Sequence, residues 1–260
     1  MLKISVGLAA LAAVLSVGTS SPAQPPPAAP SNSYTYVAQW QIPRAQWGAY
    51  TADFEKNTRP VLEKLGAAGT LTSWGAFEMV VHTPEGYTHG VWWSASTYAG
   101  LEAARAELVK SAATSTSLTA ATAHRDYQMR SIAGNGKSGA GAGGYLTVSQ
   151  YLLKPGKGQE WKQLWDKNTK PLFDDMVAKG TLDGYSIDIE DVHTDNPGYR
   201  FVVTLSPNIE AEDKLGAAFD AADEKRTPEE RKTLALQQAE LLEPGTHRDM
   251  FAKSIRHWSK

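Results

Sequence analysis

Alternating apolar and polar residues begin a regular pattern in the first half of the chain. At residues 34–42 every second side chain is apolar or aromatic, which predicts a β-strand. From residue 47 to 65 the apolar side chains recur at helical spacing, which predicts a helix with a kink or break at Pro60. Further elements are expected as strands at 70–82, 88–96 and 124–133 and as a helix at 98–112. The predicted order is βαββαβ, that of a ferredoxin-like unit.

The same pattern returns in the second half of the chain. The segments EKNTRPVLEKLGAAGTL (55–71) and DKNTKPLFDDMVAKGTL (166–182) are nearly alike, and Asn57 and Asn168 stand 111 residues apart (168 − 57). The tripeptide HRD at 124–126 recurs 123 residues later (247 − 124). The second half therefore holds 12 additional residues (123 − 111) before its last strand. We interpret the chain as a fused tandem duplication.

The two copies define the domain organisation. Unit one is expected at 34–132 and unit two at 145–258, joined by a Gly-rich linker at 133–144 that is predicted to be irregular and exposed. Unit two contains an additional predicted helix at 227–242, with a capping box formed by Thr227 and Glu230.

Each predicted sheet needs cover on the face that its helices do not occupy. We assign Tyr34, Tyr36 and Trp40 to that bare face, which is too apolar to lie in water. Packing the two sheets against each other removes both bare faces. The expected fold class is therefore α+β: two ferredoxin-like βαββαβ units packed sheet to sheet as an intrachain α+β barrel.

The N-terminus has the features of an export signal. Lys3 precedes an apolar run, and Ser21 and Ala23 occupy the small-residue positions of a signal-peptidase site. We therefore expect a signal peptide at 1–23 and a Pro-rich tether at 24–33, with an uncleaved anchor as the alternative. Cleavage predicts a periplasmic or secreted protein without a transmembrane segment.

Composition narrows the possible functions. The chain has no cysteine, which excludes disulfides, thiolate catalysis and cysteine-based metal sites. Its formal net charge of −2 becomes −3 without Lys3, so the basic surface needed for nucleic-acid binding is not expected.

The second copy carries a resemblance to a known family. The stretch YLLKPGKGQEWKQLWDKNTKPLF (151–173) resembles the first strand and helix of NIPSNAP-like members of the dimeric α+β barrel superfamily. Antibiotic-biosynthesis monooxygenases, stress-responsive barrel proteins and the haem enzyme chlorite dismutase belong to the same superfamily. Most of these proteins form the barrel by dimerising, so the resemblance implies a fused version here, as a monomer or weak homo-oligomer.

The repeated HRD tripeptides are the sharpest candidates for chemistry. On a strand, the His and Asp of each tripeptide point to one face and the Arg to the other. A carboxylate-oriented imidazole can act as a base or as a haem ligand. Alternatively, the motif has a structural role at the strand entry. These candidate catalytic residues are His124, Asp126, His247 and Asp249.

Two further repeated residue types are candidates for the site. His82 and His193 end the second strand of each unit and are expected to flank a shared cavity or only to cap turns; a metal site with Asp195 lacks supporting spacing, so no metal is expected. Asn57 and Asn168 are expected either to donate to a ligand at the barrel mouth or to satisfy backbone carbonyls near a proline.

Aromatic residues on the predicted strands are expected to line either a ligand cavity or a filled core. Because neighbouring strand residues face opposite sides, one of Trp92 and Trp93 is expected inside the barrel and the other under a helix. The ligand-binding candidates are the two asparagines and Tyr36, Trp40, Trp74, Trp92, Tyr151 and Tyr185.

Two functions remain open. One is an exported protein that binds a small apolar or aromatic ligand in a barrel cavity, without a cofactor. The other is an oxidoreductase, either a cofactor-free monooxygenase or a haem enzyme that uses a repeated histidine. Because unit one holds more tryptophans, we expect it to supply most of the cavity wall, with segment 209–246 covering the mouth or an edge. His82 and His124 are then expected to face the ligand in preference to His193 and His247.

Overall fold

The fold was analysed in a computed structural model, which describes residues 33–82, 86–193 and 197–260. The predicted signal peptide and all but one residue of the tether lie outside the described residues, as does Asp195. In the described part of the chain, no helix combines the length and apolarity needed to cross a membrane. The strands are β1 (Ser33–Gln41), β2 (Ser73–Met79), β3 (His89–Ala95), β4 (Ala123–Gly136), β5 (Gly139–Gly141), β6 (Tyr145–Leu152), β7 (Gly184–Val192), β8 (Tyr199–Ser206) and β9 (Arg248–Ser259).

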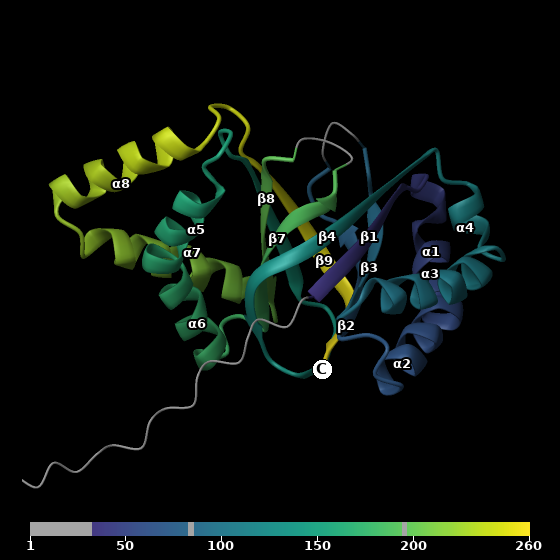
Figure 1. Ribbon diagram of the computed structural model, residues 1–260. Helices are drawn as coiled ribbons and strands as arrows, with labels where there is room; N and C mark the ends of the chain where they lie inside the picture. The colour runs from purple at the N-terminus through teal and green to yellow at the C-terminus, as the bar shows by residue number, and fades with distance from the viewer. Residues whose placement is uncertain (1–32, 83–85, 194–196) are drawn as a thin grey trace, which may run out of the picture.

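Eight of the described strands close into an antiparallel barrel at the centre of the molecule (Figure 1). The order β2-β3-β1-β4 continues into β7-β8-β6-β9, and β9 pairs back onto β2. The short strand β5 pairs with the end of β9. The expected α+β barrel is therefore present. Its two four-stranded halves are joined along their edges, through β4–β7 and β2–β9, and are not stacked face to face.

Helices cover the barrel on two opposite sides (Figure 1). One side has α1 (Trp47–Asp53), α2 (Arg59–Ala67), α3 (Tyr98–Ala112) and α4 (Thr116–Thr119), with a 3-10 turn at Arg44–Gln46. The other side has α5 (Gly158–Asn168), α6 (Lys170–Lys179), α7 (Ile209–Glu224) and α8 (Pro228–Leu241). The predicted capping box of α8 is present: Thr227 Oγ1 accepts from the Glu230 amide, and Glu230 accepts from the Thr227 amide.

The expectation that 209–246 covers the barrel mouth or an edge is wrong. Helix α7 packs against α6 and β8, and α8 packs against α5, so both lie on the outer side of unit two (Figure 1). Leu241 joins the unit-two core, where it is 5% exposed. The insertion therefore thickens the helical layer and leaves the barrel mouth to other segments.

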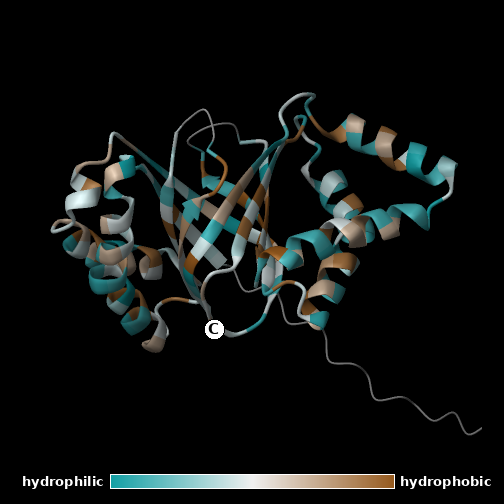
Figure 2. Cartoon of the chain, turned by 180° about the vertical axis from the view of Figure 1, so that it is seen from behind, coloured by the Kyte–Doolittle hydropathy of each residue, from teal (hydrophilic) through white to brown (hydrophobic). Residues whose placement is uncertain are grey.

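The faces of β1 are opposite to those predicted. Tyr34, Tyr36 and Trp40 pack against the core under the unit-one helices, whereas Val37 packs with the residues inside the barrel. The alternation itself was correct. Both faces of each strand are covered, so the period alone cannot say which face meets the helices. Hydrophobic and hydrophilic positions are accordingly interleaved along the barrel strands (Figure 2).

The Gly-rich linker is exposed as predicted, but it is not irregular. Residues 133–136 extend β4 and pair with β7, and β5 pairs with β9. Unpaired edges of β7 and β9 offer hydrogen-bonding groups to this backbone, and glycine places no side chain in the way. The linker therefore forms part of the rim of the barrel.

Pro60 changes the first helix without breaking it. Between α1 and α2 the chain forms a π-helix (η2, Phe54–Thr58), in which the Arg59 amide donates to the Phe54 carbonyl. A proline lacks the N–H and clashes with the carbonyl four residues earlier, so a widened turn relieves both effects. In unit two the equivalent helix breaks instead, at Thr169 between α5 and α6.

Candidate functional site

Two cavities follow from this architecture. The barrel cavity, of about 850 Å³, lies inside the strands and opens at the rim formed by residues 133–141 and 257–260. The second cavity, of about 200 Å³, lies between the outer face of the unit-one strands and helices α1 and α3. We call it the unit-one pocket; it is lined, among others, by Tyr36, Trp40, Tyr50, Asp53, Asn57, Trp93, Arg105, Ser115, His124 and Asp126.

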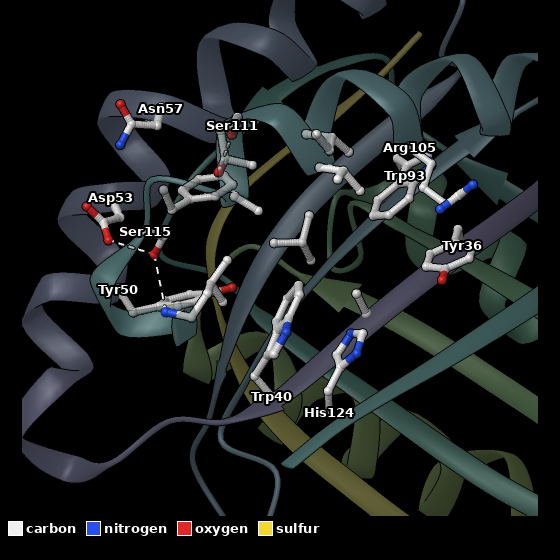
Figure 3. Close-up of a pocket in the computed structure, with 18 of the residues that line it drawn as sticks. Tyr36, Trp40, Tyr50, Asp53, Asn57, Trp93, Arg105, Ser111, Ser115 and His124 are labelled. Atoms are coloured by element: carbon white, nitrogen blue, oxygen red, sulfur yellow. Dashed lines mark hydrogen bonds between the residues drawn. The ribbon is translucent and has the colours of Figure 1, made fainter. Parts of the chain in front are cut away.

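Stacked rings form the sheet side of the unit-one pocket (Figure 3). Tyr36 stacks on Trp93, with ring centroids 4.6 Å apart, and Trp40 stacks on His124 at 5.1 Å. These side chains come from the adjacent strands β1, β3 and β4, whose outward positions meet across the sheet. Together they make a flat aromatic wall.

The HRD tripeptide of unit one lies at the edge of this wall. His124 Nε2 is 3.0 Å from Asp126 Oδ1, as expected for residues on one face of a strand. Arg125 lies on the other face, with its guanidinium 4.2 Å from the centre of the Tyr127 ring. The unit-one tripeptide therefore places an imidazole beside a carboxylate in the pocket.

The helix side supplies the polar groups (Figure 3). Ser115 Oγ donates to Asp53 Oδ2 at 2.7 Å, and Ser117 donates to the same oxygen at 3.3 Å. Tyr50 is 4% exposed, and its buried hydroxyl has no hydrogen-bond partner in the described structure. Asn57 lies on the π-helix η2. Such widened helical turns are frequent at functional sites. Tyr50 thus lines the pocket, and its buried hydroxyl is unsatisfied.

Burial and charge tune the phenols of the pocket. Burial, together with the hydrogen bond and the negative charge of Asp126, raises the pKa of Tyr36 well above its usual value. Burial alone raises the pKa of Tyr50. Both phenols are therefore protonated at neutral pH and can donate hydrogen bonds. Arg105, which pairs with Glu102 at 2.8 Å, adds a positive charge beside Tyr36.

Large aromatic side chains occupy the equivalent region of unit two. Trp161, Trp165, Phe173 and Tyr185 pack in one buried cluster there. By the 111-residue offset, Leu164 of unit two stands in the place of Asp53. An apolar side chain replaces the acid that binds Ser115, and tryptophans replace Tyr50 and Phe54. The unit-one pocket is lined by unit-one residues, whereas the larger barrel cavity is lined by both halves of the chain, so the expectation that unit one supplies most of a ligand cavity's wall stays a prediction.

The second HRD tripeptide repeats the geometry, and its residues are not among those that line either cavity. His247 stacks on Tyr151, with ring centroids 4.5 Å apart, and its Nε2 is 3.1 Å from Asp249 Oδ1. The His247 and Asp249 side chains are 51% and 54% exposed. The His124 and Asp126 side chains are 48% and 38% exposed, so both tripeptides are partly open to solvent.

The remaining predicted site residues do not form one site but lie in different parts of the fold. Trp92 lines the barrel cavity and Trp93 the unit-one pocket, so the expected division of this pair is confirmed. Trp74 is buried in the unit-one core, and the Tyr185 hydroxyl donates to Asp174. Asn168 donates to the Leu164 carbonyl, which is the backbone role considered for it.

His82 and His193 are exposed at their strand ends and are not among the residues that line either cavity. His82 lies against the edge of the Trp47 ring, 5.4 Å between centroids. The expectations that they flank a shared cavity and that His82 faces the ligand are therefore wrong.

Apart from Asn57, sequence reasoning missed the helix side of the pocket. Tyr50, Asp53 and Phe54 share one face of the helix at spacings of three and four residues, so an acid lies among buried aromatics. Asp53 is an acid where the equivalent position of unit two holds Leu164, and this difference was a sign in the sequence that the unit-one helix has a polar role. His89 was also missed: it is fully buried beside Trp47 and Tyr50.

The unit-one pocket does not fit a haem. Its volume of about 200 Å³ is below the roughly 300–1,000 Å³ of sites for drug-sized ligands. His124 offers its ring face to Trp40 and its Nε2 to Asp126, so it is not presented as an axial ligand. Among the described residues there is also no group of three or more His, Cys, Asp or Glu that could hold a metal ion.

Comparisons with known proteins agree on the fold. No family model matches the sequence. No curated protein sequence matches it either. A solved structure of a proposed monooxygenase from Lactobacillus acidophilus is similar with a TM-score of 0.61 and 11% identity, over 88% of this chain and 96% of that one. A proposed monooxygenase from Fusobacterium nucleatum has a TM-score of 0.62 and 7% identity, over 89% and 96%.

A mutant chlorite dismutase from Candidatus Nitrospira defluvii, in complex with cyanide, is similar with a TM-score of 0.52 and 9% identity, over 85% of this chain and 90% of that one. At such low identity these neighbours support the fold alone, an α+β barrel, and leave the reaction to be argued from the site.

Proposed function

We propose that the protein is a cofactor-free oxidoreductase that binds a small phenol in the unit-one pocket and oxidises it with molecular oxygen. The observation that carries this proposal is the Tyr50 side chain, which lines the pocket and whose hydroxyl is buried without a hydrogen-bond partner. Leaving such a group unsatisfied costs about 1–3 kcal/mol, and a ligand oxygen that accepts its hydrogen bond removes this cost. The monooxygenase-like and chlorite dismutase-like neighbours support the oxidoreductase class at the level of fold.

The groups of the pocket suit a phenol. Its ring fits the aromatic wall, and its oxygen accepts the hydrogen bond of Tyr50. His124, oriented by Asp126, takes the phenolic proton as a general base. The positive charge of Arg105, which lines the same pocket, stabilises the phenolate.

Molecular oxygen alone balances the reaction. With 1-naphthol as the test substrate, the phenolate gives electrons to O₂ and a C–O bond forms at the ring carbon para to the oxygen. Loss of water then leaves a second carbonyl. One oxygen atom enters 1,4-naphthoquinone and the other leaves as water, while the substrate loses two hydrogens.

The test compares the two HRD histidines. Oxygen uptake and quinone absorbance are measured with 1-naphthol for the wild type, His124→Ala and His247→Ala. Because general-base catalysis contributes about 10²–10⁴-fold, His124→Ala is expected to lower kcat by at least about 100-fold. His247→Ala, which removes the same ring stack and carboxylate contact on the other unit, is expected to keep full activity.

A third variant separates binding from proton transfer. Tyr50→Phe keeps the ring in place and removes the hydroxyl, so it is expected to raise KM more than it lowers kcat. No oxygen uptake by the wild type, or an equal loss in both histidine variants, would contradict the proposal.

A second candidate function is favoured by the size of the barrel cavity. About 850 Å³ lies within the range of sites that hold drug-sized ligands, and Trp92, Tyr127 and Phe201 give it an apolar wall. We propose that this cavity binds a small apolar or aromatic molecule without reacting with it. Binding is tested by calorimetric titration, as set out below.

A further inference from the structure

The barrel cavity has an apolar wall and one buried acid. Its wall includes Phe77, Trp92, Tyr127 and Phe201. Asp188, on β7, pairs across the sheet with Phe201 and lines the same cavity. It is 5% exposed, and its surroundings differ from those of the acids on the surface.

Two serine hydroxyls are the hydrogen-bond donors to Asp188. Ser131 Oγ donates to its Oδ1 at 2.5 Å, and Ser186 Oγ donates to its Oδ2 at 2.7 Å. In the described structure no lysine, arginine or histidine forms an ion pair with it. Asp183, at the cavity rim, has Lys137 at 3.6 Å and His257 at 3.9 Å. The deeper acid thus lacks the cation that the outer acid has.

A buried carboxylate without a cation is costly, because its charge is removed from water. Burial accordingly raises the pKa of Asp188 above its usual value, although the two serines lower it in part. Each carboxylate oxygen accepts one serine hydroxyl and can accept a second donor. A positively charged donor placed in the cavity would remove the cost of the buried charge.

The Arg125 guanidinium lies 4.2 Å from the centre of the Tyr127 ring, so one wall of the cavity already carries a cation, and the remaining titratable groups of the cavity do not oppose one. Burial lowers the pKa of His257, whose Nδ1 lies 3.1 Å from Ser254 Oγ, so this imidazole is neutral at pH 7. Lys137 and Lys260 are at the rim, and Lys137 pairs with Asp183. The inner wall also carries aromatic faces, which attract cations.

We propose that the barrel cavity binds an organic amine with an apolar or aromatic body, whose ammonium group donates to Asp188. This inference rests on the binding function proposed above for the barrel cavity, and it is independent of the reaction proposed for the unit-one pocket. The body of the ligand lies against Trp92, Tyr127 and Phe201, and the ammonium completes the hydrogen bonds of the carboxylate.

The test uses three naphthalene probes of similar size and different charge. Isothermal titration at pH 7 compares 2-(1-naphthyl)ethylamine, 2-(1-naphthyl)ethanol and 1-naphthaleneacetate on the full chain. The amine is expected to bind at least 10-fold more tightly than the alcohol, and the acetate most weakly. Asp188→Asn is expected to make the amine and the alcohol equal, whereas Asp183→Asn at the rim is expected to keep the difference.

Two further variants locate the probes. Val148→Trp fills the barrel cavity and is expected to abolish binding of all three there, whereas Trp40→Ala in the unit-one pocket is expected to leave the preference unchanged. Circular dichroism verifies the folding of each variant, and Val148→Trp provides a test that does not depend on Asp188→Asn.

Three outcomes overturn the inference. If the amine and the alcohol bind equally to the wild type and Val148→Trp blocks both, the barrel binds ligands but the amine preference is wrong. If the preference survives Asp188→Asn, the acid does not recognise the amine. If no probe binds, or if Val148→Trp has no effect, the binding function of the barrel cavity falls with the inference.

Discussion

Trp40 and Trp74 lie on the same helix-facing side of the unit-one sheet but have different surroundings. Trp74 is 4% exposed within the core, whereas Trp40 is half-buried and lines the unit-one pocket. Removing a core tryptophan costs about 3–5 kcal/mol. We therefore predict such a loss for Trp74→Ala and a loss below about 2 kcal/mol for Trp40→Ala, measured as free energies of unfolding in urea.

The same pair tests whether the pocket is a real cavity. Trp40→Ala is also expected to weaken 1-naphthol binding, because the ring loses its stacking surface. Equal losses of stability for the two variants would mean that Trp40 belongs to a filled core.

His89 makes the protein sensitive to acid. Burial and the nearby charge of His82 lower the pKa of His89 from 6.5 to about 4. Between these two pH values the unfolded state therefore binds a proton that the folded state does not bind. The stability that neutral His89 contributes is present above pH 6.5 and is lost as the pH falls towards 4. The loss amounts to about 3 kcal/mol, at roughly 1.4 kcal/mol per pKa unit.

Unfolding free energies at pH 7 and pH 4.5 measure this effect. The wild type is expected to lose more stability between these values than His89→Gln does. His193→Gln, which changes an exposed histidine at the end of β7, is expected to lose as much as the wild type. An identical pH dependence for wild type and His89→Gln would show that this histidine is not the acid-sensitive group.

Residue roles could be predicted from the sequence only where local geometry decides them. The HRD tripeptides bring His and Asp together in both units because strand residues two apart share a face. Asn57 and Asn168 look identical in sequence, yet one lines a pocket and the other binds a backbone carbonyl. That difference depends on the π-helix in one unit and the helix break in the other, which are decided by packing.

At the scale of elements, Gly75 on β2 has a role that its strand position does not reveal. A Cβ atom there would lie 2.1 Å from the Trp92 ring, which faces the barrel interior. Gly75→Ala is therefore expected to destabilise the protein by about 1–3 kcal/mol and to shift tryptophan fluorescence, because the ring must move.

A matched glycine gives the opposite result. Gly216 lies inside α7 with open space around it, so Gly216→Ala is expected to stabilise the protein by about 0.5–1 kcal/mol. Thermal melts compare both variants. A Gly75→Ala protein as stable as the wild type would mean that Trp92 does not pack on this strand.

The strands and helices follow the sequence closely, since each has a clear period and end signals. The helix predicted at 98–112 forms over the same residues, and β1 differs from its prediction by one residue at each end. The linker and the faces of β1 were wrong for a shared reason. Both depend on barrel closure, which recruits glycine-rich backbone into the sheet and covers both faces of every strand.

At the scale of the whole molecule, one chain closes the barrel. Each strand of the eight-stranded ring, among the described residues, pairs with two neighbours, so the ring has no edge to offer to a second chain. We predict a monomer by light scattering after size exclusion, at concentrations up to about 100 µM. A stable dimer would show that a surface outside the barrel strands also associates.

The central claim is that a small aromatic molecule binds between the unit-one sheet and its helices. A crystal structure of the protein soaked anaerobically with 1-naphthol tests this most directly, because the absence of oxygen prevents turnover. We predict naphthol density against Trp40 and Trp93, with the naphthol oxygen within hydrogen-bond distance of the Tyr50 hydroxyl. Naphthol density in the barrel cavity alone, or an unchanged pocket at saturating naphthol, would contradict it.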